Sequence, residues 1–331
     1  MAYQGSGDTS WLAMLLGVQT GGCAKAPALA SSVGKREYNM AATQRWLLFG
    51  TLLASLAGLA GCSSIGTLNT VNSLTPGDSG TERIATDIAF GSDPRQKLDI
   101  YSPTAGGKAP VIVFFYGGSW NSGRRQDYAF AARALAAKGF VVVVPDYRLV
   151  PQVHFPAFVE DGASAIAWTR SHIAEHGGDP ARIGVSGHSA GAYIALMLAL
   201  DPQWLARAGA PGAIKAAVGL AGPYDFLPFV PGGAADLALG GPGDLAFTQP
   251  IRFASADAPP VLLLNGAGDT TVLPRNATNL AAALTARGGV AQARIYPEIG
   301  HIGILLALSK PFRGKAPALE DSAGFFHKQL G

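Results

Sequence analysis

The chain has 331 residues, of which 48% are hydrophobic and only 14% are charged, and it carries a formal net charge of +3. This composition excludes a disordered chain and supplies enough apolar side chains for one large core. The small net charge, without a long run of Lys or Arg, excludes the basic surface typical of nucleic-acid binding. Cys23 and Cys62 are the two cysteines, so the chain beyond Cys62 has no cysteine nucleophile and no cysteine metal ligand.

An apolar run precedes the part of the chain with alternating secondary-structure patterns. Residues 46–61 read WLLFGTLLASLAGLAG and follow Arg45, as the hydrophobic region of a secretory signal follows its basic residue. The run has 16 residues and is shorter than the ~20 residues of a membrane-spanning helix. It leads into Leu59-Ala60-Gly61-Cys62, which resembles the bacterial lipobox. That resemblance implies cleavage before Cys62 and lipidation of its thiol.

A start at Met40 would give a lipoprotein signal peptide of ordinary length, residues 40–61. We therefore expect residues 1–39 to be a mis-called start or a leader. Residues 62–81 are rich in Ser, Thr, Gly and Asn and predict a flexible tether. Ser63 implies, by the same resemblance, an outer-membrane location in the bacterial cell envelope. A plain transmembrane anchor and a soluble signal peptide that yields a periplasmic or secreted protein stay open as alternatives.

Strand-like and helix-like segments alternate from about residue 82 to residue 331. Continuous apolar runs such as PVIVFFY are typical of strands that are buried on both faces. Helices are indicated by apolar residues at helical spacing and by glycines at their ends, as at Gly139. The expected strands are 83–90, 96–101, 110–116, 140–144, 182–186, 215–220, 261–265 and 292–296, and the expected helices are 126–138, 157–174, 190–200, 276–287 and a last one within 316–329.

This alternation predicts parallel βαβ crossovers and therefore an α/β fold, a doubly wound, mostly parallel sheet flanked by helices. The first two strands are joined by Gly91-Ser92-Asp93-Pro94 and predict an N-terminal antiparallel hairpin. Residues 226–257 are rich in Pro, Gly and Ala and interrupt the alternation. Ligands of such sheets bind outside the carboxyl ends of the strands. We expect one domain, residues 82–331, whose insertion is either a small cap over the site or an ordinary surface excursion.

The most specific motif is Gly187-His188-Ser189-Ala190-Gly191, which fits G-x-S-x-G and lies between a predicted strand and a predicted helix. A sharp strand-to-helix turn would make side chains two positions from the serine collide, which explains both glycines. The turn holds the Ser189 hydroxyl clear of the sheet at a helix start, where backbone amides favour developing negative charge. The motif therefore predicts Ser189 as a nucleophile.

A serine nucleophile needs a base, and the base needs a group that orients it. His301 follows the last predicted strand at the carboxyl edge of the sheet, where a base can reach Ser189. The acid of such a triad lies between the serine and the histidine in chain order. Asp269, after the strand VLLLN, is the preferred candidate, and Asp225, after the preceding strand, is the alternative.

An oxyanion hole needs backbone N–H donors near the developing negative charge. One donor is expected from Ala190, directly after the nucleophile. The other is expected from the loop after the strand at 110–116, which contains Gly117, Gly118 and Ser119. Glycines allow this backbone to turn its amides toward the substrate.

Together these residues resemble the carboxylesterase and lipase branch of the α/β-hydrolase superfamily over about residues 82–331. The likeness is to esterases related to hormone-sensitive lipase, to feruloyl esterases and to kynurenine formamidase. It is carried by YGGSW at 116–120, by Asp146-Tyr147-Arg148 and by GHSAG. One departure is Tyr116, which stands where the family has a histidine that holds the glycine loop through hydrogen bonds.

The resemblance implies further roles beside the triad. Trp120 would line the acyl or alcohol pocket, with a place in the core as an equal alternative, and His188 is a candidate substrate contact. Asp161 would have a structural role at the start of its helix.

The residues predict a serine carboxylesterase that hydrolyses small or medium esters through an acyl-enzyme. An arylformamidase or amidase with the same triad and a non-catalytic surface binding protein are the alternatives. The sequence has no H-E-x-x-H motif and no cluster of metal-ligand residues, so we expect neither metal nor other cofactor. The expected partners are a small-molecule ester and, through Cys62, the membrane. Nothing in the sequence fixes the oligomeric state.

Overall fold

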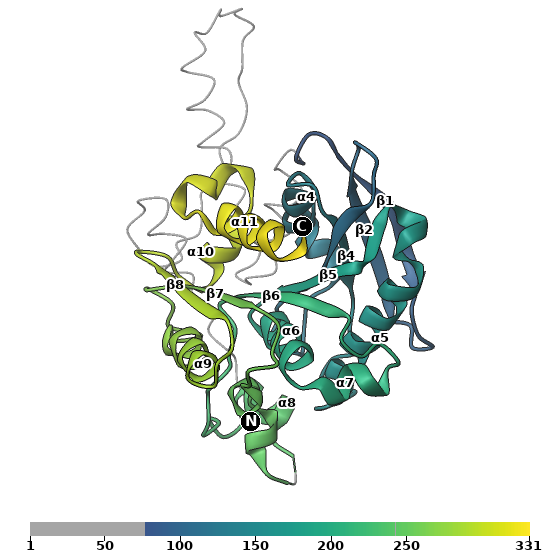
Figure 1. Cartoon of the computed structure of the whole chain (residues 1–331). Helices are drawn as coiled ribbons and strands as arrows, with labels where there is room; N and C mark the ends of the chain where they lie inside the picture. Colours follow the sequence, from purple (N-terminus) through teal and green to yellow (C-terminus); the bar gives the residue numbers. More distant parts are fainter. Residues whose placement is uncertain (1–76, 242) are drawn as a thin grey trace, which may run out of the picture. The chain divides into compact units, whose positions relative to one another are not determined.

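The computed structural model describes residues 77–241 and 243–331 (Figure 1). The signal peptide, Cys62 and most of the tether expected from the sequence lie outside the described residues. The described chain is built on an eight-stranded sheet with the spatial order β1-β2-β4-β3-β5-β6-β7-β8. The strands are β1 (Thr81–Ala89), β2 (Lys97–Pro103), β3 (Ala109–Phe115), β4 (Val141–Pro145), β5 (Gly178–His188), β6 (Ile214–Leu220), β7 (Val261–Gly266) and β8 (Ala291–Tyr296).

The direction of the strands confirms the predicted fold class. Strands β3 to β8 pair in parallel, whereas β2 pairs antiparallel with β1 on one side and with β4 on the other. The pair β1–β2 is the expected N-terminal hairpin. Strands β3 and β4 are buried along nearly their whole length, because helices cover both faces of the central sheet. Their continuous apolar sequence is the direct consequence of that burial.

Helices cover the sheet on two sides. In Figure 1, α4 and α11 lie above the strands, and α5, α6 and α9 lie below them. The most buried of these is α6, in which nearly every side chain is inaccessible to solvent. The helices are α4 (Ala129–Ala136), α5 (Ala157–His172), α6 (Ala190–Leu200), α7 (Pro202–Arg207), α8 (Ala234–Leu239), α9 (Arg275–Ala286), α10 (His301–Leu306) and α11 (Ala318–Leu330), and the 3₁₀ turns are η1 (Arg125–Tyr128), η2 (Ile173–His176), η3 (Leu245–Thr248), η4 (Pro250–Phe253) and η5 (Lys310–Lys315).

Three short helices, α7, α8 and α10, have no counterpart in the sequence-based prediction. Each has six residues, too few for a helical period to show. Pro202 begins α7, where its fixed φ suits the first helical position, and the Asp201 side chain accepts a hydrogen bond from the Gln203 N–H. No helix within residues 77–241 and 243–331 combines the length and apolar character needed to cross a membrane.

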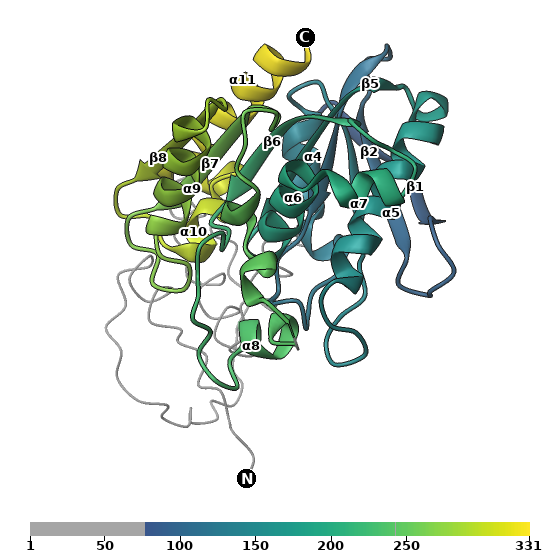
Figure 2. The same cartoon turned by 60° about the horizontal axis from the view of Figure 1, so that its bottom comes forward.

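The segment between β6 and β7 contains α8, η3 and η4 and coincides with the expected insertion at 226–257 (Figure 2). The Tyr193 hydroxyl on α6 donates to the Thr248 carbonyl at 2.8 Å. The Phe155 N–H, just before α5, donates to the Ala238 carbonyl on α8 at 2.9 Å. These hydrogen bonds fasten the insertion both to α6 and to the segment before α5.

Three parallel strands of the sheet end close to the residues expected to carry chemistry. Strand β5 ends at His188, β7 at Gly266 and β8 at Tyr296. Because β5, β6, β7 and β8 are parallel and adjacent, their carboxyl ends lie at one edge of the sheet. The loops that follow these strands therefore meet there.

Helix α11 is held on the sheet by Phe326, which packs edge-on against Phe140 with 6.0 Å between ring centroids. A Cβ added to Gly184 on β5 would lie 2.6 Å from the Phe326 ring, so the helix rests directly on the strand. We expect Phe326→Ala to lower the free energy of unfolding by about 3–5 kcal/mol, because it leaves a cavity in a fully buried site. Urea unfolding measures this change. Phe325→Ala, at the partly exposed neighbour, is the control, and an equal loss in both variants would contradict the packing argument.

Candidate active site

Ser189 lies in the turn between β5 and α6, with φ at 54° and ψ at −123°. A positive φ is strained for a residue with a side chain. A Cβ at Gly187 would lie 2.5 Å from the Gly191 carbonyl oxygen, and one at Gly191 would lie 2.2 Å from the Phe115 oxygen. The backbone is packed too closely for any other residue at these two positions. The structure thus contains the strand–turn–helix elbow that the motif predicts.

The structure brings Ser189, His301 and Asp269 together. The Nε2 atom of His301 lies 2.9 Å from Ser189 Oγ, and its Nδ1 atom lies 2.8 Å from Asp269 Oδ2. The Asp269 side chain is fully buried, and the His301 side chain is 13% exposed. An imidazole between a carboxylate and a hydroxyl is the arrangement that activates a serine in hydrolases.

The Asp269 carboxylate is fixed by its own loop. Its Oδ1 atom accepts hydrogen bonds from the backbone N–H groups of Thr271 at 2.9 Å and Val272 at 2.8 Å. Oδ2 is thereby turned toward His301, and the Asn265 side-chain amide lies 3.5 Å from it. The two backbone donors thus fix the orientation of the carboxylate, and Oδ2 faces His301 Nδ1.

The alternative acid, Asp225, is held elsewhere. Its Oδ2 atom accepts a hydrogen bond from the Asn279 side chain at 2.7 Å, and its backbone N–H donates to Asn276 Oδ1 at 2.9 Å. Both asparagines belong to α9. The residue that meets the His301 imidazole is Asp269, and Asp225 ties the start of the insertion to α9.

The glycine loop after β3 lies directly against the nucleophile. A Cβ at Gly117 would be 3.0 Å from Ser189 Cβ. The loop then turns back sharply, with φ of 136° at Gly118 and 52° at Ser119, and the Ser122 N–H closes the turn on the Gly118 carbonyl at 3.0 Å. This places the predicted oxyanion segment next to the serine.

Ala190 is the first residue of α6. The first N–H groups of a helix have no carbonyl partner within the helix and face outward from its start. Its amide therefore belongs to the same small region as Ser189 and the glycine loop. The positive end of the α6 dipole adds to the preference for negative charge at this point.

Comparison with known proteins agrees with this geometry. The BD-FAE family model matches residues 98–284, which is more than half of the chain. The chain belongs to the BD-FAE family. A second model, for the prolyl oligopeptidase family, matches residues 244–331.

Several esterases are similar to this BD-FAE-family protein. Esterase LipC of Mycobacterium tuberculosis is 33% identical over 56% of this chain and 51% of its own length. Esterase LipQ of the same organism is 30% identical over 73% of this chain and 62% of its own. Isoprenylcysteine alpha-carbonyl methylesterase of Arabidopsis thaliana is 28% identical over 75% and 63%. The chain thus spans about half to two thirds of the length of these relatives.

Solved structures support the same fold. Esterase B of Lactobacillus rhamnosis superposes with a TM-score of 0.70 at 18% identity, over 87% of this chain and 96% of that one. A truncated carbohydrate esterase from gut microbiota gives a TM-score of 0.68 at 21% identity, over 77% and 99%. At such low identity the likeness concerns the fold of the BD-FAE-family domain.

Tyr116, at the family's histidine position, is braced by Arg95. The Arg95 guanidinium donates to the Tyr116 hydroxyl at 2.8 Å and to the Gly123 carbonyl at 3.0 Å. The Tyr147 hydroxyl donates to the Tyr116 carbonyl at 2.9 Å, and the two rings stack at 4.6 Å. Gly123 in turn packs against the glycine loop, because a Cβ at Gly123 would lie 2.7 Å from the Gly117 oxygen. Arg95 therefore supports the glycine loop through Gly123 as well as through Tyr116.

Sequence reasoning gives no role to Arg95, because it lies in the turn of the N-terminal hairpin, far along the chain from the glycine loop. Tyr116 is the signal in the sequence that could have pointed to Arg95, because a buried phenol hydroxyl needs a polar partner. Burial raises the pKa of the Tyr116 phenol, with the Asp146 charge adding to the rise, so the hydroxyl stays neutral as a hydrogen-bond acceptor from Arg95.

His188 and Trp120 are not where substrate contacts are expected. His188 is 1% exposed, and its ring nitrogens lie 3.3 Å from the Tyr128 hydroxyl and 3.0 Å from the His301 carbonyl. Trp120 is 4% exposed and packs edge-on against Tyr193. Both side chains are enclosed by the protein, which speaks against the substrate contacts predicted for them. Trp120 takes the core position that the sequence left open.

Asp161 has the structural role implied by the resemblance. Its carboxylate receives the Arg148 guanidinium, with Nη2 at 2.7 Å and Nε at 2.9 Å, and the Arg148 backbone N–H at 2.8 Å. The Gln96 amide donates to the same carboxylate at 2.7 Å. Asp161 thus fixes the loop between β4 and α5. Over residues 77–241 and 243–331, no group of three or more His, Cys, Asp or Glu is placed to hold a metal ion.

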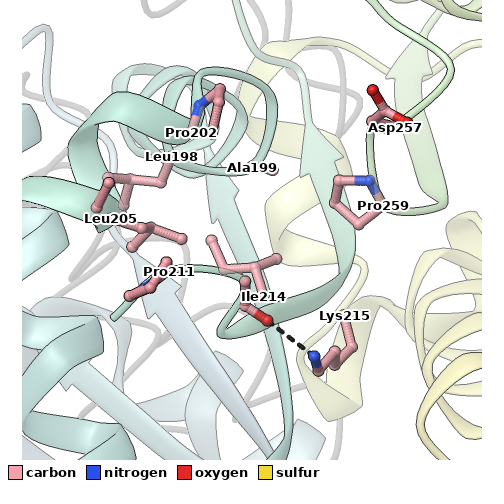
Figure 3. Close-up of a pocket in the computed structure, with 11 residues that line it drawn as sticks. Leu198, Ala199, Pro202, Leu205, Pro211, Ile214, Lys215, Asp257 and Pro259 are labelled. Carbon is pink, nitrogen blue, oxygen red and sulfur yellow. Dashed lines mark hydrogen bonds between the residues drawn. The ribbon is translucent and has the colours of Figure 1, made fainter. Parts of the chain in front are cut away.

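An open hollow of about 370 Å³ lies far from these residues (Figure 3). It is lined mainly by apolar side chains, among them Leu198, Leu205 and Ile214. Ile214 begins β6, whereas the other end of that strand, Leu220, accepts the Ser189 N–H at 2.9 Å. At about 3.3 Å per residue the two ends are roughly 20 Å apart. The hollow is therefore separate from the triad.

Burial lowers the pKa of His188 from 6.5 to about 3, and the neighbouring His301 adds to the shift. Between these two values the unfolded chain binds a proton on this imidazole that the folded chain does not bind. The stability of the fold therefore decreases as the pH falls from 6.5 toward 3, by about 1.4 kcal/mol per pH unit.

We expect His188→Gln to remove this dependence. Its free energy of unfolding, from urea titrations, should fall between pH 7 and pH 5 by about 2 kcal/mol less than that of the wild type. His172→Gln, at an exposed histidine of α5, is the control and should keep the wild-type slope. The same slope in the wild type and in His188→Gln would contradict the burial argument.

Proposed function

We propose that this chain is a serine carboxylic-ester hydrolase with Ser189 as nucleophile, His301 as base and Asp269 as the acid that orients it. The observation that carries the proposal is the continuous hydrogen-bonded line from Ser189 Oγ through the His301 imidazole to Asp269 Oδ2. The esterases among its relatives support the same reaction class. The complete triad also speaks against a purely binding role.

The reaction follows from the positions of these groups. Ser189 Oγ attacks the ester carbonyl carbon, its proton passes to His301 Nε2, and the carbonyl π electrons move onto the oxygen. When the tetrahedral intermediate collapses, the bond to the alcohol oxygen breaks, that oxygen takes the proton from His301, and an acyl-Ser189 remains. Water then attacks the acyl group with His301 again as base, which releases the carboxylic acid and restores the serine.

The charge on the tetrahedral oxygen needs backbone donors. The proposed donors are the Ala190 amide, which directly follows Ser189, and the amides of Gly118 and Ser119, which belong to the loop packed against Ser189 Cβ. The α6 dipole supports the same charge. Fixed donors of this kind need no reorganisation as the charge develops, which is why they lower the barrier.

The surroundings of Ser189 favour substrates with apolar groups of small or medium size. Tyr193 lies one helical turn beyond Ser189 and packs edge-on against Phe226, with 6.1 Å between ring centroids. Phe226 in turn contacts Phe229 at 5.5 Å, at the start of the insertion. Phe226 and Phe229 are only half-buried and lie in the segment that follows β6 at this edge of the sheet, so their rings offer apolar surface for an acyl or alcohol group.

The test is hydrolysis of p-nitrophenyl acetate, butyrate and octanoate by residues 63–331. We expect turnover by the wild type and a loss of kcat by at least about 10⁴-fold in Ser189→Ala, because the covalent step is abolished. Asp269→Asn should lose about 10³–10⁴-fold, because an amide no longer selects the right tautomer of His301. Ser171→Ala, at an exposed serine of α5, is the control and should keep wild-type rates.

Either of two results would reject the ester-hydrolase proposal. One is equal turnover by Ser189→Ala and wild type. The other is a folded wild type that hydrolyses none of the three esters, and an aryl formamide offered to the same enzyme would then distinguish an amidase from a binding protein.

The second part of the proposal concerns location. The motif Leu59-Ala60-Gly61-Cys62 supports a lipid anchor on Cys62 in the bacterial cell envelope, on the outer membrane, with residues 63–81 as the tether. A membrane-held esterase would act on esters that reach the cell from outside.

In a Gram-negative host that expresses the full chain, we expect an alkyne analogue of palmitate to label the protein and the protein to sediment with membranes. Cys62→Ser should abolish the label and release the protein from the membrane fraction. Cys23→Ser is the matched control and should keep both properties. Labelling of Cys62→Ser at the wild-type level would reject the anchor.

A further inference from the structure

His188, the buried histidine of the elbow, lies between His301 and Tyr128. Its Nε2 atom lies 3.0 Å from the carbonyl oxygen of His301, and its Nδ1 atom lies 3.3 Å from the Tyr128 hydroxyl. The rings of His188 and His301 are 4.9 Å apart between centroids. Its neighbour Ser189 is the proposed nucleophile, so the chain places this imidazole at the centre of the site.

The chemistry of the two contacts fixes the tautomer of His188. A carbonyl oxygen only accepts hydrogen bonds, so Nε2 carries the ring proton and donates a hydrogen bond to the His301 carbonyl oxygen. The Nδ1 atom then has a lone pair, and the Tyr128 hydroxyl donates to it. Burial raises the pKa of the Tyr128 phenol, which keeps its proton on the oxygen for this purpose.

The glycine loop rests on the same imidazole. A Cβ at Gly117 would lie 3.0 Å from His188 Nδ1 and 2.9 Å from the His188 carbonyl oxygen. The Gly117 backbone amide is also close enough to the Tyr128 hydroxyl to oppose part of the rise in its pKa. Tyr128, His188 and the loop therefore form one packed unit.

We propose that Tyr128 and His188 are a positioning pair, which fixes the backbone of His301 on one side and the glycine loop on the other. The inference rests on the proposed function, because the pair is assigned to hold the proposed base, His301, and the proposed oxyanion loop in alignment. Neither residue touches the reacting atoms.

The position of His301 explains why its backbone needs a hold. It is the first residue of α10, a helix of six residues, directly after Gly300. So short a helix gives little rigidity of its own. A misplacement of a reacting group by about 1 Å can cost about 10²-fold in rate. The hydrogen bond from His188 to the His301 carbonyl acts on the residue that carries the base.

The neutral state of His188 matters when His301 takes the proton of Ser189. His301 becomes positively charged when it takes the serine proton, and a second positive charge on the adjacent ring would oppose this. The titratable groups in contact with His188 are Tyr128 and His301. A buried imidazole with both nitrogens in fixed hydrogen bonds holds the base without adding charge.

The experiment compares amides of two lengths at position 188. In His188→Gln the amide nitrogen reaches the place of Nε2 and can donate to the His301 carbonyl, whereas in His188→Asn it reaches only the place of Nδ1. With p-nitrophenyl butyrate we expect His188→Asn to lower kcat by about 30–100-fold with KM within twofold, and His188→Gln to recover to within about fivefold of the wild type. Tyr128→Phe, which keeps the ring, should lower kcat by about 5–10-fold without a change in KM.

A second readout does not depend on activity. In ¹⁵N NMR of imidazole-labelled protein, His188 should be the neutral Nε2–H tautomer from pH 5 to pH 9, and Tyr128→Phe should shift its Nδ1 resonance. His172→Gln is the control in both experiments and should match the wild type.

The outcomes separate the two proposals. An active wild type with an equally active His188→Asn, or an Nδ1–H tautomer in the NMR spectrum, would overturn the positioning pair. A wild type that hydrolyses no ester would overturn the proposed function, and the tautomer would then decide on the pair alone. Loss of kcat in His188→Asn with recovery in His188→Gln supports the pair, because a general loss of packing would affect both amides.

Discussion

The strained backbone at Ser189 is the constraint on which the rest of the site depends. A residue with a side chain at φ 54° costs on the order of 1–3 kcal/mol, and it persists because the surrounding structure allows no relaxation. Gly191 is packed against the Phe115 carbonyl, and the Ser189 N–H is bonded to the end of β6. The burial of nearly all of α6 offsets the strain. The serine oxygen is thereby held at a single place at the edge of the sheet.

Everything else in the site is arranged around that place. Because β5 to β8 are parallel neighbours, the loops after β7 and β8 bring Asp269 and His301 to the same edge. The Asp269 loop satisfies one carboxylate oxygen with its own amides and leaves the other for the imidazole. The sheet brings the three triad residues together, and side-chain hydrogen bonds complete their alignment.

Buried polar side chains hold the glycine loop and the backbone of His301 in place. Arg95 reaches from the N-terminal hairpin to Tyr116 and to the backbone of the glycine loop, and His188 reaches from the elbow to the backbone of His301. Each contact joins segments that are distant in the chain. A polar group enclosed by protein is costly without a partner, so these contacts have few alternative arrangements. Because they have few alternative arrangements, these contacts can keep the active-site residues aligned.

The sequence by itself determined the parts that depend on local pattern. Alternating apolar runs predicted the parallel sheet, the G-x-S-x-G turn predicted the elbow and its glycines, and chain order singled out His301. The sequence favoured Asp269 over Asp225 but did not exclude the latter, because both follow adjacent strands. Only the tertiary structure decided between them, since the direction of a carboxylate depends on loop hydrogen bonds. It also decided the burial of Trp120 and His188 and the role of Arg95, because these depend on contacts between segments far apart in the chain, to which periodicity and motif spacing are insensitive.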